Sequence, residues 1–168
     1  MKTQILAIPK EKIALFYFSV LFGISIVLPL FHSQYVTGPM VNAVLFLSAV
    51  LSGSTGAMLI AMVPSVIALS TGLLPAVMAP AVPFIMLGNG ILIAAFLSLQ
   101  KKNFWIAAIS AGFLKFVFLF GSSRIIAGLI VKKQTAFAAA AMLGFPQLVT
   151  ALAGAVLAYG ILKFLKRI

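Results

Sequence analysis

The stretch LLPAVMAPAVPFIMLGNG, residues 73–90, places three prolines among apolar residues and then one asparagine between two glycines. Prolines this closely spaced do not fit inside one helix, because each lacks an N–H donor and its ring clashes with the preceding turn. Pro83 suits the first turn of a helix, where a missing N–H costs little. We therefore interpret the stretch as an apolar loop that contains Pro80, followed by a helix that carries Asn89.

The composition makes lipid the expected solvent of this chain. Of its 168 residues, 64% are hydrophobic and 8% are charged, whereas soluble proteins carry about 25% charged residues. Twelve Lys and Arg accompany a single acid, Glu11, which gives a formal net charge of +11. The bases occur in small clusters between apolar runs, as in the loops of membrane proteins. We therefore expect a lipid bilayer as partner and no nucleic acid.

Apolar runs predict a single domain, residues 1–168, with six membrane-spanning helices. Their approximate ranges are 13–30, 40–51, 56–73, 83–99, 104–131 and 137–165. The first run is too long for the apolar core of a signal peptide and no A-x-A cleavage site follows it, so we interpret it as an uncleaved span. The second is expected to be short, roughly 18 Å at 1.5 Å per residue against a bilayer core of about 30 Å.

The distribution of basic residues predicts that both termini are cytoplasmic. Lys and Arg cluster before the first span, at residues 101–102 and after the last span, and cytoplasmic loops are enriched in these residues. Six crossings place all three clusters on one side and leave Lys132 and Lys133 on the other. The expected fold is an all-α integral membrane protein, a six-transmembrane-helix bundle with cytoplasmic N- and C-termini.

The side-chain inventory argues against an enzyme. Catalysis by side chains needs acids, bases or nucleophiles within reach of one another, and this chain has no Asp, one Glu, one His and no Cys. The predicted topology places Glu11 and His32 on opposite sides of the membrane. The same inventory does not make a usual metal site, and no G-x-x-x-x-G-K-[ST] phosphate loop is present. We expect no catalytic residue, metal or cofactor.

Isolated polar residues in the predicted spans indicate a binding pocket that opens to the outside. The candidates for substrate binding are Asn42, Asn89, Lys115, Arg124 and Gln147. Lys115 is the strongest, because a lysine near mid-membrane costs about 2.5–3.5 kcal/mol and no acid is available to pair with it. Lys115 and Arg124 are nine residues apart, roughly 180° around an ideal helix, so they share a ligand only if FGSSR, residues 120–124, breaks the helix.

These residues also have structural interpretations. Asn42 could cap its helix, whereas Asn89 and Gln147 could form hydrogen bonds between helices, worth about 0.6 kcal/mol each. Arg124 could extend to the outer head groups.

Two further groups of residues are candidates for a lid and for a docking face. His32 and Tyr35, in the first outer loop, could cover the pocket together with Pro80, or anchor the chain at the membrane surface. Ser19 and Gly23 have the four-residue spacing of small residues that lets membrane helices approach closely. They could therefore pack inside the bundle or dock a partner.

The layout resembles the substrate-binding S components of energy-coupling factor (ECF) transporters. The resemblance is carried most directly by residues 36–92, VTGPMVNAVLFLSAVLSGSTGAMLIAMVPSVIALSTGLLPAVMAPAVPFIMLGNGIL. KFVFLFGSSR and GFPQLVTALAGAVLA give weaker support. The family implies a six-helix bundle in a prokaryotic plasma membrane that captures a vitamin or a precursor from outside, in a pocket capped by the loops after the first and third helices.

The resemblance also implies partners. S components dock on an energy-coupling transmembrane subunit driven by two ATPase subunits, through an A-x-x-x-A motif on the first helix. Here Ser19 and Gly23 keep that spacing without the alanines. The five binding candidates match the family's binding region by position only.

Two functions therefore remain open from the sequence. The first is an S component whose basic pocket takes a ligand with a carboxylate or a phosphate, with pyridine and flavin-like rings also open given 15 Phe. The second is a structural or assembly membrane protein, in which the polar residues only join helices.

Overall fold

The structure, a computed structural model, describes residues 9–129 and 142–168. Lys132, Lys133 and the predicted start of the last span lie outside the described residues. The elements in chain order are α1 (Lys10–Val27), the 3₁₀ helix η1 (Leu28–Phe31), α2 (Gln34–Leu51), α3 (Gly53–Ser70), the 3₁₀ helix η2 (Ala76–Ala81), α4 (Val82–Leu99), α5 (Phe104–Leu129) and α7 (Phe145–Phe164).

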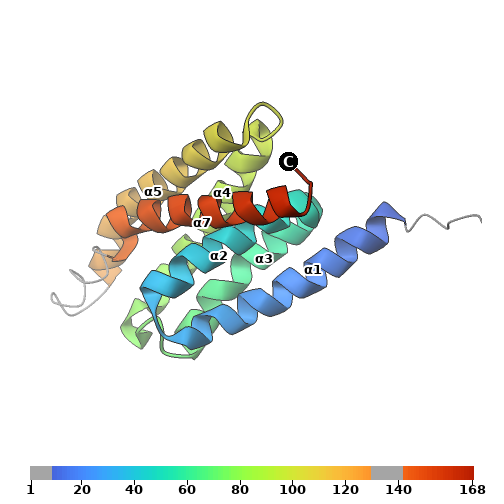
Figure 1. Ribbon diagram of the computed structural model, residues 1–168. Coiled ribbons are helices and arrows are strands. Elements are labelled where there is room, and N and C mark those ends of the chain that lie inside the picture. Colours follow the sequence, from blue (N-terminus) through green and yellow to red (C-terminus); the bar gives the residue numbers. More distant parts are fainter. Residues whose placement is uncertain (1–8, 130–141) are drawn as a thin grey trace, which may run out of the picture.

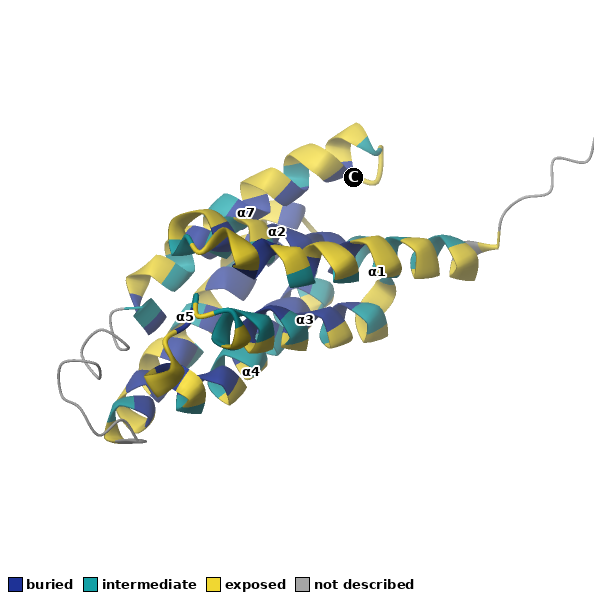
Figure 2. Ribbon diagram, turned by 90° about the horizontal axis from the view of Figure 1, so that it is seen from below, coloured by how far each residue is buried: buried dark blue, intermediate teal, exposed yellow. Residues whose placement is uncertain are grey.

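Six helices in the described residues are long and apolar enough to cross a membrane. This confirms the all-α fold class and the architecture of a multi-pass membrane protein. The outward faces are apolar as well, since Phe16, Phe120 and Val156 are 64%, 59% and 59% exposed. Figure 2 shows the buried residues on the inward sides of the helices and the exposed ones outside. An apolar exterior of this kind is suited to lipid tails.

The second helix is longer than the sequence predicts. α2 begins at Gln34 and not near residue 40, so it has 18 residues and does not form a short limb. Gly38 and Pro39 were expected to precede the helix. Pro39 removes only the hydrogen bond to the carbonyl of Tyr35, and Tyr35 is 87% exposed at the start of the helix, where the lost bond costs least.

The proline-rich stretch also differs in part from the expectation. Pro83 does lie in the first turn of α4, as predicted, but Pro80 belongs to the 3₁₀ helix η2 and not to an irregular loop. The connection between the second and third helices is shorter than the predicted ranges imply, since α3 begins at Gly53 and not near residue 56: Ser52 alone separates α2 from α3, and Gly53 has a φ of +77°, which glycine adopts without strain. α5 continues through residues 120–124 to Leu129, so FGSSR does not break the helix.

The helices surround α2, which packs against α1, α3, α4 and α7, whereas α1 lies at the edge against α2 and α3. Their alternating directions bring the start of α1, the α2–α3 turn, the α4–α5 loop and the C-terminus to one end of the bundle (Figure 1). At this end the guanidinium carbon of Arg167 lies 5.9 Å from the ring centroid of Tyr17.

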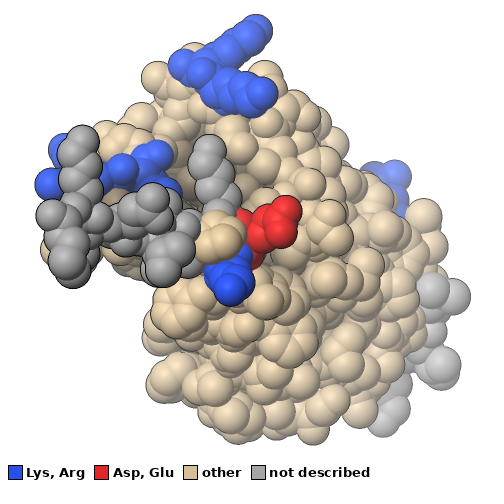
Figure 3. All heavy atoms as spheres, turned by 90° about the vertical axis from the view of Figure 1, so that its right-hand side faces the viewer, with Lys and Arg blue, Asp and Glu red and all other residues tan. Residues whose placement is uncertain are grey.

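We call this end the basic end. Its exposed cations are Lys12, Lys101, Lys102, Lys163, Lys166 and Arg167, and Figure 3 shows Lys and Arg side chains on the face that looks out from it. The opposite end holds η1, η2 and the first residues of α2, α4 and α7, and we call it the pocket end.

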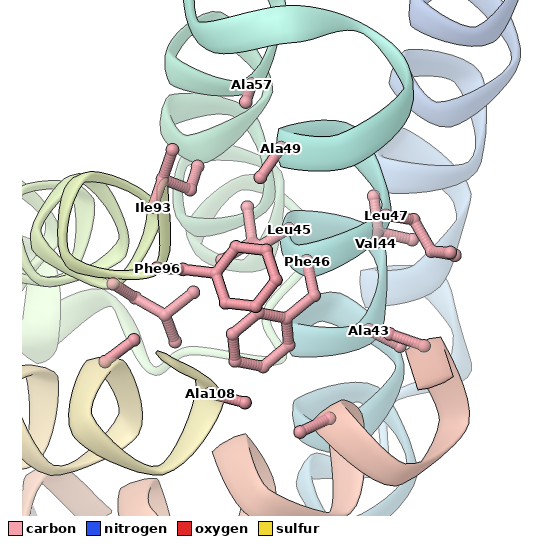
Figure 4. Packing of buried hydrophobic residues seen from close by; sticks show 14 of the residues in the cluster. Ala43, Val44, Leu45, Phe46, Leu47, Ala49, Ala57, Ile93, Phe96 and Ala108 are labelled. Carbon is pink, nitrogen blue, oxygen red and sulfur yellow. The ribbon is translucent and has the colours of Figure 1, made fainter. Parts of the chain in front are cut away.

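An apolar core fills the half of the bundle toward the basic end. Phe46 of α2 and Phe96 of α4 are fully buried with ring centroids 5.0 Å apart, and the ring of Phe104 in α5 lies 5.4 Å from that of Phe96. Figure 4 shows the rings of Phe46 and Phe96 against each other in this core. The polar residues considered below lie on the other side of this core, toward the pocket end.

Substituting Gly154 with alanine is expected to destabilise the bundle by about 1–3 kcal/mol, the usual range for overpacking. A methyl group at Gly154 of α7 would lie 2.6 Å from Cβ of Asn42, 2.7 Å from the carbonyl oxygen of Pro39 and 2.8 Å from the backbone nitrogen of Ala43. Two of these atoms are backbone, so α2 and α7 must separate. Thermal unfolding in detergent measures the effect.

Gly160, on the same helix, provides the matched control. Apart from the surrounding turns of its own helix, no heavy atom of the described chain lies within 4 Å of a methyl group added there, and alanine favours a helix over glycine by about 1 kcal/mol. Gly160→Ala should therefore unfold at the wild-type temperature or above it. Equal destabilisation by the two substitutions would contradict the close approach of α2 and α7.

Candidate ligand-binding site

A cavity of about 110 Å³ lies among α2, α3, α4, α5 and the start of α7, toward the pocket end. Apolar residues supply most of its wall, and eight polar residues also line it. These are Gln34, Thr37, Asn42, Ser65, Asn89, Lys115, Gln147 and Thr150. Four of the five binding candidates predicted from the sequence are therefore brought together here.

Lys115 is buried, with 2% of its surface exposed, and its Nζ donates a hydrogen bond to Oδ1 of Asn42 at 2.7 Å. The chain's single acid, Glu11, is exposed in the first turn of α1 at the basic end. It therefore cannot reach a group buried beside the cavity. In the described part of the chain the ammonium of Lys115 thus has one hydrogen-bond partner, a neutral amide, and a buried charge without a counter-ion is costly.

Asn42 holds Lys115 in place, and its Nδ2 also forms hydrogen bonds. Its Nδ2 donates to the carbonyl of Gly38 at 2.9 Å and to the hydroxyl of Thr150 at 3.3 Å. A lysine only donates and a carbonyl only accepts, so these partners fix the orientation of the amide. Asn42 lies in the middle of α2 and does not cap it, which corrects that interpretation.

The start of α7 supplies the next polar groups. The hydroxyl of Thr150 donates to the carbonyl of Gln147 at 3.2 Å, and Nε2 of Gln147 donates to the carbonyl of Met142 at 3.1 Å. Gln147 is half-buried and lines the cavity. Its amide therefore links the beginning of α7 to the residues just before it.

Asn89 and Ser65 carry buried polar atoms without a partner. Nδ2 of Asn89 donates to the carbonyl of Ala61 in α3 at 3.0 Å. Among the described residues, Oδ1 of Asn89 and Oγ of Ser65 have no hydrogen-bond partner. Leaving such an atom unsatisfied costs about 1–3 kcal/mol, so both atoms lack a partner that the described residues could supply.

The two connections described at the pocket end both contribute to the wall of the cavity, but not through the residues predicted for a lid. Leu73, Leu74 and Met78 line it, whereas Pro80 does not. His32 is also absent from the wall; its Nε2 lies 2.9 Å from the carbonyl oxygen of Thr71, so it links the first connection to the one after α3. Tyr35 lines a separate neighbouring pocket.

Arg124, the fifth binding candidate, is not among the residues that line this cavity. Because α5 remains helical through residue 124, Arg124 and Lys115 face different directions: Arg124 is exposed, whereas Lys115 is buried. A side chain outside the wall has no ligand to contact, and a long exposed cation suits the head-group region.

Replacing Arg124 with glutamine should therefore change the affinity of the cavity for any ligand by less than about twofold, a difference within 0.5 kcal/mol. Isothermal titration of the detergent-solubilised variant measures this affinity. A tenfold loss would place Arg124 in the site after all.

The candidate docking residues lie away from the cavity. Ser19 is exposed on α1 and donates its hydroxyl hydrogen bond to the carbonyl of Leu15 at 3.0 Å. Gly23 is also exposed, and no heavy atom of the described chain lies within 4 Å of a methyl group added there. These small residues therefore do not pack inside the bundle.

The cavity does not continue as a channel through the described part of the chain. Beyond Asn42, α2 continues with the fully buried Leu45 and Phe46, and beyond Asn89, α4 continues with Ile93 and Phe96. These apolar side chains close the cavity toward the basic end. Among the described residues, no group of three or more His, Cys, Asp or Glu could hold a metal ion.

Comparison with known protein families, with characterised proteins and with solved structures finds no significant match to this chain. The functional argument therefore rests on the residues of the cavity and on their chemistry.

Proposed function

We propose that this protein is a membrane-embedded binding subunit that captures a small anionic molecule, as the S component of an ECF-type ATP-driven importer of a vitamin or its precursor. The observation that carries the proposal is the ammonium of Lys115, buried beside a cavity and bonded only to the neutral amide of Asn42 in the described structure. An anionic ligand supplies the counter-ion that the chain lacks. The cavity opposite the apolar core suits capture from one side of the membrane.

The direction of capture follows from the basic end. Lys and Arg are enriched in cytoplasmic loops, so we assign the basic end to the cytoplasm of a prokaryotic cell and the pocket end to the outside of its plasma membrane. Both termini are then cytoplasmic. The cavity lies toward the outer end, where a nutrient arrives.

Energy must come from partner subunits under this proposal. The sequence contains no phosphate loop, so transport requires an energy-coupling transmembrane subunit and two ATPase subunits. The exposed Ser19 and Gly23 on α1 support a docking face, because small residues allow a second helix to approach closely. The position of α1 at the edge of the bundle leaves that face open.

The direct test is to purify the protein in mild detergent from cells grown in rich medium and to identify bound small molecules by native mass spectrometry. We expect one organic anion to be retained at near-stoichiometric amounts and to be lost from Lys115→Met. Protein that carries no small molecule, and that gains no stability from any vitamin or precursor, would overturn the proposal.

A structural or assembly role is the alternative, and two contacts favour it. Asn42 of α2 bonds to Thr150 of α7, and Asn89 of α4 bonds to the carbonyl of Ala61 in α3. Both are hydrogen bonds between helices, worth about 0.6 kcal/mol each in membranes. This role does not explain why a lysine is buried at the same place, whereas ligand capture does.

A further inference from the structure

We propose that the ligand is a single-ring organic anion that also carries an N–H or O–H donor, with its anionic group at Lys115 and its donor at Asn89 and Ser65. This substrate class rests on the function proposed above and makes it more specific. Three properties of the cavity lead to it: the donors left on Lys115, the acceptors left on α3 and α4, and the volume.

The anionic end follows from the lysine. An ammonium has three N–H donors, and the described structure uses one, in the 2.7 Å bond to Asn42. Asn42 has committed Oδ1 to this bond and Nδ2 to Gly38 and Thr150, so it does not compete for the ligand. Two charged donors remain for a carboxylate or a similar group. Such charge-assisted hydrogen bonds are stronger than hydrogen bonds between neutral groups.

The donor end follows from Asn89. Its Nδ2 is held by the carbonyl of Ala61, so the amide cannot turn over, and Oδ1 remains a buried acceptor with no donor among the described residues. Ser65 lies one turn after Ala61 on α3 and also has an unpartnered hydroxyl oxygen. Both residues are more than nine-tenths buried and line the cavity. An amide oxygen only accepts, so its partner must donate.

The size follows from the volume. The cavity measures about 110 Å³, whereas pockets for drug-sized ligands measure roughly 300–1,000 Å³ and an engineered cavity of about 150 Å³ takes benzene. Leu74, Met78 and Ile85 supply apolar wall between the two polar ends. The cavity volume is below that of the benzene cavity, so the ligand has at most a single six-membered ring, for which the surrounding side chains must move slightly apart, and a flavin-like ring system is too large.

A panel of simple probes tests this class on the purified wild-type protein. Benzoate has the anion alone, the three aminobenzoate isomers add a donor in different positions, and benzamide has no charge. We expect at least one aminobenzoate to bind tenfold or more tightly than benzoate in isothermal titration. Benzamide should bind at least tenfold more weakly than benzoate. Equal affinities for benzoate and every aminobenzoate, or for benzoate and benzamide, would overturn the inference.

Variants locate the two ends of the ligand. Asn89→Leu and Ser65→Ala should each reduce the preference for the best aminobenzoate over benzoate to threefold or less. Two variants are used because Asn89→Leu also removes the bond to Ala61, and Ser65→Ala removes no hydrogen bond that the structure shows. Arg124→Gln, outside the cavity, should keep the wild-type preference. A preference unchanged in both cavity variants would overturn the placement of the donor.

The outcome also separates this inference from the proposed function. If the purified protein releases a bound small molecule but no probe of the panel binds, the substrate class is wrong and the capture function stands. If the released molecule lacks an anionic group or a donor, the class is again wrong. If the protein releases nothing and binds nothing, the capture function fails together with the class.

Discussion

Lys115→Met is expected to lower the affinity for an anionic ligand at least 100-fold, which corresponds to about 2.7 kcal/mol. Methionine resembles the lysine side chain in length and supplies no charge or donor. The ligand's anionic group would then enter a cavity that offers only neutral groups, and an unpaired buried charge is costly. The ligand-free protein should tolerate the change, because the buried ammonium is itself unfavourable.

The stability of the ligand-free variant results from two opposing effects. Removing a mid-membrane lysine is favourable by about 2.5–3.5 kcal/mol on insertion scales. Oδ1 of Asn42 loses its hydrogen-bond donor, however, and an unsatisfied buried acceptor costs about 1–3 kcal/mol. We therefore expect a midpoint of thermal unfolding equal to or slightly above that of the wild type. Loss of affinity without loss of stability is the result that a merely structural lysine would not produce.

Lys101→Met provides the matched control for charge. Lys101 lies exposed in the loop between α4 and α5 at the basic end, so this variant loses the same charge far from the cavity. Its affinity should equal that of the wild type. If Lys101→Met weakened the ligand as strongly as Lys115→Met, the effect would come from net charge and not from a contact in the cavity.

The sequence was sufficient to predict the class of fold, because the length and apolar composition of the runs alone indicate membrane-spanning helices. Runs of apolar residues long enough to cross a bilayer predict helices whatever their neighbours are, and the structure has six of them in the described residues. The beginning of α2 was not predicted. Gly38 and Pro39 usually mark a loop, but here the helix loses only one bond near its end.

The composition of the cavity was predicted in part. A polar side chain in an apolar span is costly unless it has a partner, so such residues were chosen as binding candidates. Four of them line the cavity: Asn42, Asn89, Lys115 and Gln147. Arg124 satisfied the same criterion but faces outward. Whether a residue faces inward depends on the rotation of its helix against its neighbours, and α5 has too little difference between its faces for the sequence to reveal that rotation.

Little in the sequence indicates that Ser65 and Thr37 line the cavity. Ser65 follows Pro64 in an apolar run, and Thr37 precedes residue 40, where the sequence predicts the start of the second helix. Serine and threonine commonly bond to their own helix backbone, as Ser48 does to the carbonyl of Leu45. Their presence in a span therefore says little, and only the tertiary structure distinguishes Ser65, whose hydroxyl has no partner among the described residues.

Asn42→Asp is expected to lower the affinity for an anionic ligand at least 100-fold, about 2.7 kcal/mol, by supplying an internal counter-ion. The wild-type amide oxygen already lies 2.7 Å from Nζ of Lys115, and aspartate has nearly the same shape as asparagine. Its carboxylate would pair with the ammonium in the place where the amide now bonds. The ligand's anion would then have to compete with a charge of the same sign that is held permanently in the cavity.

The effect of Asn42→Asp on stability distinguishes this result from a damaged fold. The new carboxylate loses the bond to Gly38 that Nδ2 makes at 2.9 Å, and its oxygen faces that carbonyl. The new carboxylate also neutralises the charge of Lys115, which offsets this cost, because a buried ion without a partner strongly destabilises a protein. We expect the ligand-free variant to unfold within a few degrees of the wild type.

Thermal unfolding with and without ligand measures both effects in one experiment. A ligand at 100 times its Kd stabilises the protein that binds it by about 2.7 kcal/mol, so the wild type should unfold at a higher temperature with ligand and Asn42→Asp should not. Asn42→Leu is the control: it removes the amide without adding a charge, and it should destabilise the ligand-free protein. If Asn42→Asp bound the anion as tightly as the wild type, then Lys115 would not be its binding group, and the polar residues of the cavity would serve only to join helices.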